Sequence, residues 1–181
     1  MNLQDFSQLC IHPYPAIKDL REHFHKNNKS IFLTTDFAEM PYTEKFQFFI
    51  QNYIQVYQAI VQQHPSQVQE LTDSIQFIAP LGTIYLTFNG FKPPLKLLST
   101  PEQYKKWEEL IYSGRLIGAY AQTEIGHGSD VQSLQLTATY DKETKTFVLN
   151  SPNTRSIKFW PGSLGIQATH AVCQAQTYVD G

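Results

Sequence analysis

The hydrophobic periodicity of this chain changes once along its length, close to Gly114. Before that point apolar residues recur every three to four positions, the spacing that gathers them on one face of a helix. From about Leu116 onward they alternate with polar residues, which is the pattern of half-buried strands. A chain with helices first and strands afterwards predicts an α+β fold. We place the boundary between a helical N-terminal domain, residues 1–115, and a partial β domain, residues 116–181.

The clearest predicted helix begins near Thr43 and ends at His64, because a residue that precedes proline is disfavoured in the α region. A shorter helix is predicted over residues 16–25. The apolar face of the longer helix is predicted to contain Phe46, Phe49, Ile50, Tyr53, Tyr57, Ile60 and Val61.

Two further helices are expected before the change of period. A buried helix is predicted over residues 75–88, interrupted by Pro80 and Gly82. A loop is predicted after it, because the turn-forming pairs Asn89–Gly90 and Pro93–Pro94 follow. In the last helix, Thr100 is the expected N-cap, Pro101 suits the first helical position, and Gln103 completes a capping box. Gly114 is the expected stop signal.

The strands are predicted as a hairpin and one further strand. The run from Leu134 to Tyr140 alternates, Asp141–Thr144 forms a polar turn, and Thr146–Leu149 returns. Thr169–Val179 predicts the next strand. So few strands leave an unpaired edge and a half-covered face, so we expect the chain to be a fragment of a longer protein or to pair with something else.

Composition narrows the class of protein. Hydrophobic residues make up 41% of the 181 positions, which is enough for a buried core. The 14 basic and 16 acidic residues give a net charge of −2, so a nucleic-acid partner is not expected. No apolar run approaches the ~18 residues of a membrane span, and the N-terminus lacks a secretory signal. Cys10 and Cys173 are far apart and are expected to be free thiols of a soluble, intracellular protein.

Two stretches carry candidate chemistry. In Gly118–Asp130 a strand runs into a turn whose glycines, Gly126 and Gly128, let the backbone approach a ligand closely. Hydroxyl donors from Thr123 and Ser129 suit the polar edge of a planar heterocycle, or a phosphate. Taken alone, a glycine-containing turn between strands is more often simply a turn.

The second stretch is Ser156–Gly165, in which Trp160 precedes Pro161–Gly162. An exposed tryptophan there would form an aromatic wall beside a ring system. The alternative is a core tryptophan at the end of a strand.

Together the two stretches resemble the peroxisomal acyl-CoA oxidases, within the acyl-CoA dehydrogenase superfamily. The resemblance covers about residues 118–179, with weaker echoes at Leu81–Gly82 and Thr100–Gln103 in the helical part. The matching blocks follow one another in the order and spacing of that family: Ala119–Glu124, Gly126–Ser129, Thr137–Asp141, Asn150–Pro152, Ser156–Lys158, Trp160–Gly162, Leu164–Gly165 and Thr169–Val172.

The resemblance implies a fold and a set of binding residues. The β part would be the start of a β-barrel or sandwich middle domain that binds flavin, and the family's C-terminal helical domain is absent from this chain. FAD would be held by Thr123, Gln122, Gly162 and Trp160, and the acyl-CoA would be bound by Ser129 and Gly128. Ser163 departs from a second glycine that is common in the oxidases, and Phe159 replaces a frequent tryptophan.

The implied reaction is the α,β-dehydrogenation of a fatty acyl-CoA to a trans-2-enoyl-CoA in peroxisomal β-oxidation. Electrons pass through FAD to O2 and give H2O2, in a protein that is usually a homodimer. In this family the catalytic base is a glutamate of the later helical domain, so no catalytic residue is expected here. Glu124, beside Thr123, is interpreted as a salt-bridge or turn residue. The alternatives are an acyl-CoA dehydrogenase and a non-catalytic, oxidase-like assembly subunit.

The histidines do not predict a metal site. His23 and His25 lie two positions apart on a predicted helix, so their side chains point in different directions. His170 is expected to be structural. His127 lies in the candidate loop and either contacts a ligand or faces solvent.

Overall fold

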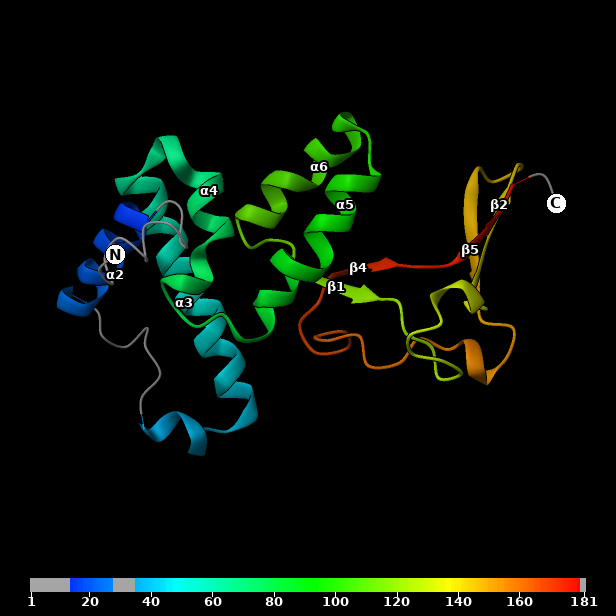
Figure 1. Cartoon of the computed structure of the whole chain (residues 1–181), viewed down its shortest axis with the longest axis horizontal. Coiled ribbons are helices and arrows are strands. Elements are labelled where there is room, and N and C mark those ends of the chain that lie inside the picture. Colours follow the sequence, from blue (N-terminus) through cyan, green and yellow to red (C-terminus); the bar gives the residue numbers. More distant parts are fainter. Residues whose placement is uncertain (1–13, 28–34, 180–181) are drawn as a thin grey trace, which may run out of the picture.

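The computed structural model describes residues 14–27 and 35–179, and Figure 1 shows their arrangement. Helices gather at one end, a three-stranded sheet lies at the other, and a two-stranded sheet lies between them. The helices are α2 (Tyr14–Asn27), α3 (Tyr42–Gln63), α4 (Val68–Asp73), α5 (Lys92–Leu98) and α6 (Pro101–Tyr112). The strands are β1 (Gly118–Ala121), β2 (Thr137–Asp141), β3 (Thr146–Asn150), β4 (His170–Cys173) and β5 (Gln176–Tyr178). The α+β class predicted from the periodicity is confirmed.

The hydrophobic core lies in the helical region. Helix α2 contributes Ile17, Leu20 and Phe24, which recur at helical spacing and are almost completely buried. Helix α3 packs beside it. Its buried residues include Tyr53 and Ile60, as predicted, but the apolar face was wrong at two positions: Val61 is exposed and Val56 is buried instead.

Residues 75–91 form several short helical turns rather than one helix. Two 3-10 turns, Ile75–Phe77 and Gly82–Ile84, are followed by a π-helical segment, η6 (Thr87–Phe91). Gly82 adopts a φ of +51°, which an ordinary helix does not tolerate. The prediction that this segment is buried was right, but the prediction that it forms a single helix was wrong.

The loop predicted after this segment is also wrong. Asn89–Gly90 lies inside η6, and Pro93–Pro94 lies in the first turn of α5. Proline is compatible with that turn because the first backbone N–H groups of a helix have no intrahelical acceptor. The capping box of α6 is confirmed: the N–H of Gln103 donates to the Thr100 hydroxyl, and the N–H of Thr100 donates to the Gln103 side chain.

The strands form two separate sheets. Strand β1 pairs in parallel with β4, while β2 pairs antiparallel with β3 and in parallel with β5. The predicted hairpin is therefore confirmed. The single strand predicted over residues 169–179 is wrong, because it divides into β4 and β5, which join different sheets. Within the described residues the strands close no barrel, and every residue of β3 is exposed.

The η6 segment joins the helical region to β1. The N–H of Gly118 donates to the Thr87 hydroxyl at 3.0 Å. The ring of Phe91 lies against Gly118 so closely that a Cβ there would fall 2.1 Å from the Phe91 Cγ. This contact fixes the point at which the chain leaves the helices and enters the candidate loop.

Candidate functional site

Backbone hydrogen bonds bring the two predicted stretches side by side. The N–H of Phe159 donates to the carbonyl of Thr123 at 3.0 Å. The N–H of Ile125 donates to Ile157 at 3.0 Å, and that of Gly126 donates to Arg155 at 2.8 Å. Residues 123–126 therefore run along residues 155–159, although 32 positions separate Thr123 from Arg155 (155 − 123).

Gln122 and Thr123 are half-buried at the end of β1. The Tyr120 hydroxyl donates to the Gln122 side chain, and Lys158 Nζ donates to the Gln122 carbonyl at 2.8 Å. The sequence prediction did not assign Lys158 a role. Its signal was indirect, since a lysine between the apolar Ile157 and Phe159 would point to the opposite side of an extended segment.

Glu124 is the most completely buried charged side chain of the loop, with 0% of it exposed. Its carboxylate accepts hydrogen bonds from the N–H groups of Gln135 and Leu136, each at 2.9 Å, and from Lys158 Nζ at 3.1 Å. Burial alone raises the pKa of the Glu124 carboxyl, but the two N–H groups and Lys158 outweigh it and lower the pKa below its ordinary value. The interpretation of Glu124 as a salt-bridge residue is confirmed.

Trp160 projects into solvent, with 75% of the residue exposed. Its ring stacks with that of Phe159 at 6.4 Å between centroids and 13° between planes. Its backbone φ of +50° is unusual for a bulky residue, and such strain is most often found at functional sites. The alternative of a core tryptophan is therefore wrong.

Gly162 and Ser163 form the turn after Trp160. A Cβ at Gly162 would fall 2.2 Å from Leu86 Cδ1, so this turn packs against the residue that precedes η6. Ser163 has a φ of +64°, and its carbonyl accepts hydrogen bonds from the N–H groups of Ile166, Gln167 and Ala168. A positive φ is the conformation that glycine adopts without strain, so Ser163 holds a backbone conformation that glycine would adopt more easily.

Gly128 and Ser129 are exposed at the far end of the loop. A Cβ at Gly128 would meet nothing within 4 Å, so the space beside it is open. His127 does not face solvent: its side chain is 12% exposed and its Nε2 lies 3.4 Å from the Glu124 carboxylate.

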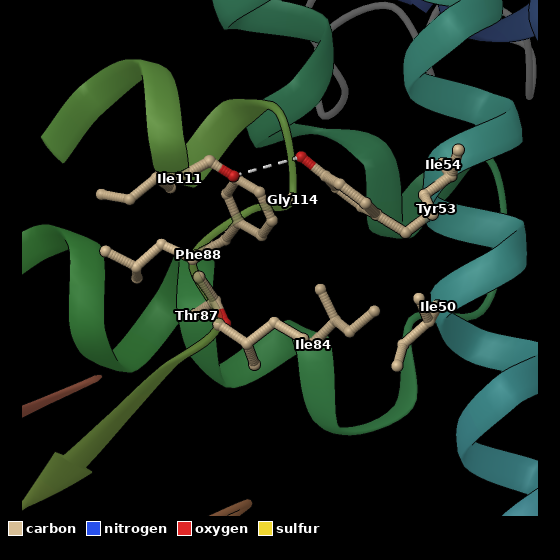
Figure 2. Close-up of a pocket in the computed structure, with 10 residues that line it drawn as sticks. Ile50, Tyr53, Ile54, Ile84, Thr87, Phe88, Ile111 and Gly114 are labelled. Carbon is tan, nitrogen blue, oxygen red and sulfur yellow. Dashed lines mark hydrogen bonds between the residues drawn. The ribbon is translucent and has the colours of Figure 1, made fainter. Parts of the chain in front are cut away.

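A small apolar pocket lies within the helical region, and none of the loop residues described above lines it (Figure 2). Its polar groups have partners: the Tyr53 hydroxyl donates to the carbonyls of Ile111 and Tyr112, and the Thr87 hydroxyl contacts Gly118. Burial, followed by the neighbouring Tyr57, raises the pKa of Tyr53. We interpret this pocket as a packing feature, lined by Ile50, Tyr53, Ile54, Ile84, Thr87, Phe88, Ile111, Gly114, Leu116 and Ile117.

An ion pair between a buried lysine and a partly exposed aspartate joins three helices of the same region. Lys92 of α5 pairs with Asp73 of α4, and the Tyr112 hydroxyl of α6 lies 3.1 Å from Lys92 Nζ. Burial, followed by the charge of Asp73, raises the pKa of Tyr112. These three groups satisfy one another, so the cluster is structural.

The remaining predictions concern the cysteines, His170, a membrane span and a metal site. Cys173 is a free thiol whose pKa is raised by burial, whereas Cys10 lies outside the described residues. His170 stacks edge-on against Trp107. Over residues 14–27 and 35–179, no helix is both long and apolar enough to cross a membrane, and no group of three metal-ligating side chains occurs.

Residues 16–117 match the family model described as "Acyl-coenzyme A oxidase N-terminal", so the chain belongs to the acyl-CoA oxidase family. The family match lies on the helical region, where the sequence showed only weak echoes, whereas the motifs of the resemblance lie beyond it. The oxidase resemblance is confirmed.

Curated relatives and solved structures agree with that family. The chain is 46% identical over 107 residues to the "Peroxisomal acyl-coenzyme A oxidase 1" of Phascolarctos cinereus, and 44% identical to that of Homo sapiens. Each alignment covers 59% of this chain and 16% of the relative. An acyl-CoA oxidase structure from tomato superposes with a TM-score of 0.75 at 32% identity, over 94% of this chain and 26% of that chain.

A structure of acyl-CoA oxidase-1 from Caenorhabditis elegans, complexed with FAD and ATP, superposes with a TM-score of 0.72 at 28% identity. It covers 92% of this chain and 26% of that chain. The chain thus spans about one sixth of the curated relatives and about a quarter of these solved chains.

Proposed function

We propose that this chain contributes part of the flavin and substrate site of an FAD-dependent acyl-CoA oxidase. The site would oxidise a fatty acyl-CoA to a trans-2-enoyl-CoA and pass the electrons to O2, giving H2O2. The observation that carries the proposal is the pairing of residues 123–126 with 155–159, which places a threonine-bearing loop beside an exposed tryptophan.

The residues present fit one side of a flavin. Trp160 offers an exposed aromatic face, and Thr123 and Ser129 offer hydroxyl groups that suit the polar edge of the ring system and the acyl-CoA. Gly162 would contact the cofactor through its backbone, with Gln122 beside Thr123, and Gly128 leaves open space next to Ser129. Bound FAD would supply hydride acceptance, while these residues orient the cofactor and the thioester.

The catalytic base is not assigned to any residue of this chain. Glu124 is excluded, because both of its carboxylate oxygens already accept hydrogen bonds inside the fold. We therefore propose that this polypeptide alone does not turn over acyl-CoA, and that the base is a glutamate of a helical domain found in longer members of the family. H2O2 formed by the purified chain from a long-chain acyl-CoA would contradict this.

Three finer assignments accompany the proposal. The relatives are named as peroxisomal proteins, which supports a peroxisomal location. The complete oxidase is proposed to be a homodimer. The division into a helical domain over residues 1–115 and a flavin-binding β domain over residues 116–181 is likewise proposed.

The test is FAD binding by the chain and by a Trp160→Ala variant. We expect visible flavin absorbance in the purified protein and an FAD affinity that falls about fivefold in the variant, the effect of losing one aromatic stack. Phe147→Ala, which removes another exposed aromatic ring, is the matched control and should bind FAD normally. If the chain binds no FAD, or if both variants behave alike, the proposed site is wrong.

Two readouts separate the alternatives. A chain that binds no flavin but associates stably with another oxidase subunit would support the non-catalytic assembly role. In a longer form that carries the base, oxygen consumption during acyl-CoA oxidation distinguishes an oxidase from a dehydrogenase that passes its electrons to another protein.

A further inference from the structure

The Glu124 carboxylate connects three separate stretches of the chain. Glu124 itself follows Thr123 in the candidate loop, Lys158 precedes the Phe159–Trp160 pair, and Gln135 and Leu136 lead into β2. The Leu136 carbonyl in turn accepts a hydrogen bond from the N–H of Gln176 at the start of β5, at 2.8 Å. One buried side chain therefore links both proposed flavin-binding stretches to the sheet.

We propose that Glu124 is a positioning residue that sets Thr123 and Trp160 in the geometry that binds flavin. The inference rests on the proposed function and adds a residue that acts without touching the cofactor. Lys158 completes the arrangement, because its Nζ lies 2.8 Å from the Gln122 carbonyl and 3.1 Å from the carboxylate. The charge pair thus fixes the chain on both sides of Thr123.

A neutral amide cannot replace this carboxylate. The side chain of Glu124 is 0% exposed and that of Lys158 is 11% exposed, so neither group has water as a ready substitute partner. In Glu124→Gln, one oxygen is replaced by an NH2 donor that faces a backbone N–H or the lysine, and a buried donor without an acceptor is costly. Lys158 also loses its counter-charge. We expect the 122–126 and 155–160 stretches to separate locally while the helical core remains folded.

The test compares Glu124→Gln with Glu109→Gln in the FAD-bound protein. Glu109 also forms an ion pair, with Arg115, but its side chain is 83% exposed, so the same chemical change should be silent there. Glu124→Gln is expected to weaken FAD affinity about tenfold, the effect of losing a hydrogen bond to a charged group. It should also alter the visible circular dichroism of the bound flavin.

A purely structural role gives a different result. The folded fraction of Glu124→Gln would then bind FAD with unchanged affinity and an unchanged flavin spectrum, and the positioning role would be overturned. If the unchanged protein and Glu109→Gln both bind no FAD, the proposed function itself fails. If only Glu124→Gln fails to fold, Lys158→Met is the second test, because it keeps both backbone hydrogen bonds of the carboxylate. A smaller change in the flavin spectrum, in the same direction, supports the positioning role. An unchanged flavin spectrum overturns it.

The pH dependence of FAD affinity is an independent test of the positioning role of Glu124. The folded-state pKa of Glu124 is lowered, so the ionised carboxylate stabilises the folded loop fully above the ordinary carboxyl pKa of about 4.3. This stabilisation is lost as the pH falls through the lower folded-state pKa. FAD affinity should fall over that acid range in the unchanged protein, and the step should be missing in Glu124→Gln. The charged or titratable groups that face the carboxylate are Lys158, His127 and the more distant Cys173.

Discussion

The helical region and the β region of this chain are held together by different forces. Over residues 14–27 and 35–179, the buried members of the main hydrophobic cluster lie between Ala16 and Leu116. Beyond that point few apolar residues are buried and most of them are alanines, so polar residues make up a larger share of the buried side chains: Glu124, Ser156 and Ser163. Apolar burial stabilises the first region without regard to direction, whereas hydrogen bonds in the second fix particular atoms relative to one another.

This difference suits a binding site. A loop held by directional contacts presents Thr123 and Trp160 in one arrangement, while every residue of β3 is exposed. The helical region contains the hydrophobic core. The η6 segment fixes β1 relative to that core through the contacts of Thr87 and Phe91 with Gly118.

The largest expected difference between the regions is in the free energy of unfolding lost when a leucine is replaced by alanine in each. Leu20→Ala should lower the free energy of unfolding by about 3 kcal/mol, because Leu20 is fully buried in the core. Leu149→Ala on β3 should change it by less than about 0.5 kcal/mol, because Leu149 is 58% exposed. Urea unfolding measures both, and equal effects would break the comparison.

The joint between the regions should be the next most sensitive place. Gly118→Ala should lower the free energy of unfolding by about 2 kcal/mol, because its methyl group would overlap the Phe91 ring. Gly128→Ala, which meets no atom within 4 Å, is the control and should be almost neutral. If thermal unfolding shows no difference between the two variants, β1 is not fixed by η6.

A local contact inside the helical region should have a smaller effect. Thr100→Ala removes the acceptor for the N–H of Gln103 and should cost about 1 kcal/mol. Thr100→Ser keeps the hydroxyl and should restore most of the loss in the same unfolding measurement.

The smallest effect is expected at the strained turn of the β region. Ser163→Gly should raise the free energy of unfolding by about 0.5 kcal/mol, because relief of the positive φ exceeds the loss of the hydroxyl contact with the Gly162 carbonyl. Ser163→Ala keeps the strain and loses that contact, so it should be destabilising. A stabilising alanine would show that the backbone strain is not what matters at this turn.

The errors of the sequence prediction share a physical cause. Proline and glycine at 89–94 predicted a loop, but tertiary packing of Phe88 and Phe91 holds that segment helical. Residues 169–179 carry one strand pattern, but β1 and β2 lie in different sheets, so their partner strand must divide between them. Val61 was assigned to the apolar face of α3 because local periodicity does not reveal which flank of a helix its neighbours cover.

The sequence by itself determined the α+β class, the limits of the long helix and of α6, the hairpin, and the resemblance to the family whose model matches the helical region. These depend on spacing and on local capping, which neighbouring residues decide. Only the tertiary structure decided that Glu124 and Lys158 form one buried pair, that Trp160 is exposed on a strained backbone, and that η6 holds β1. Such contacts join residues far apart in the chain, and their energies depend on burial and direction, which no local pattern encodes.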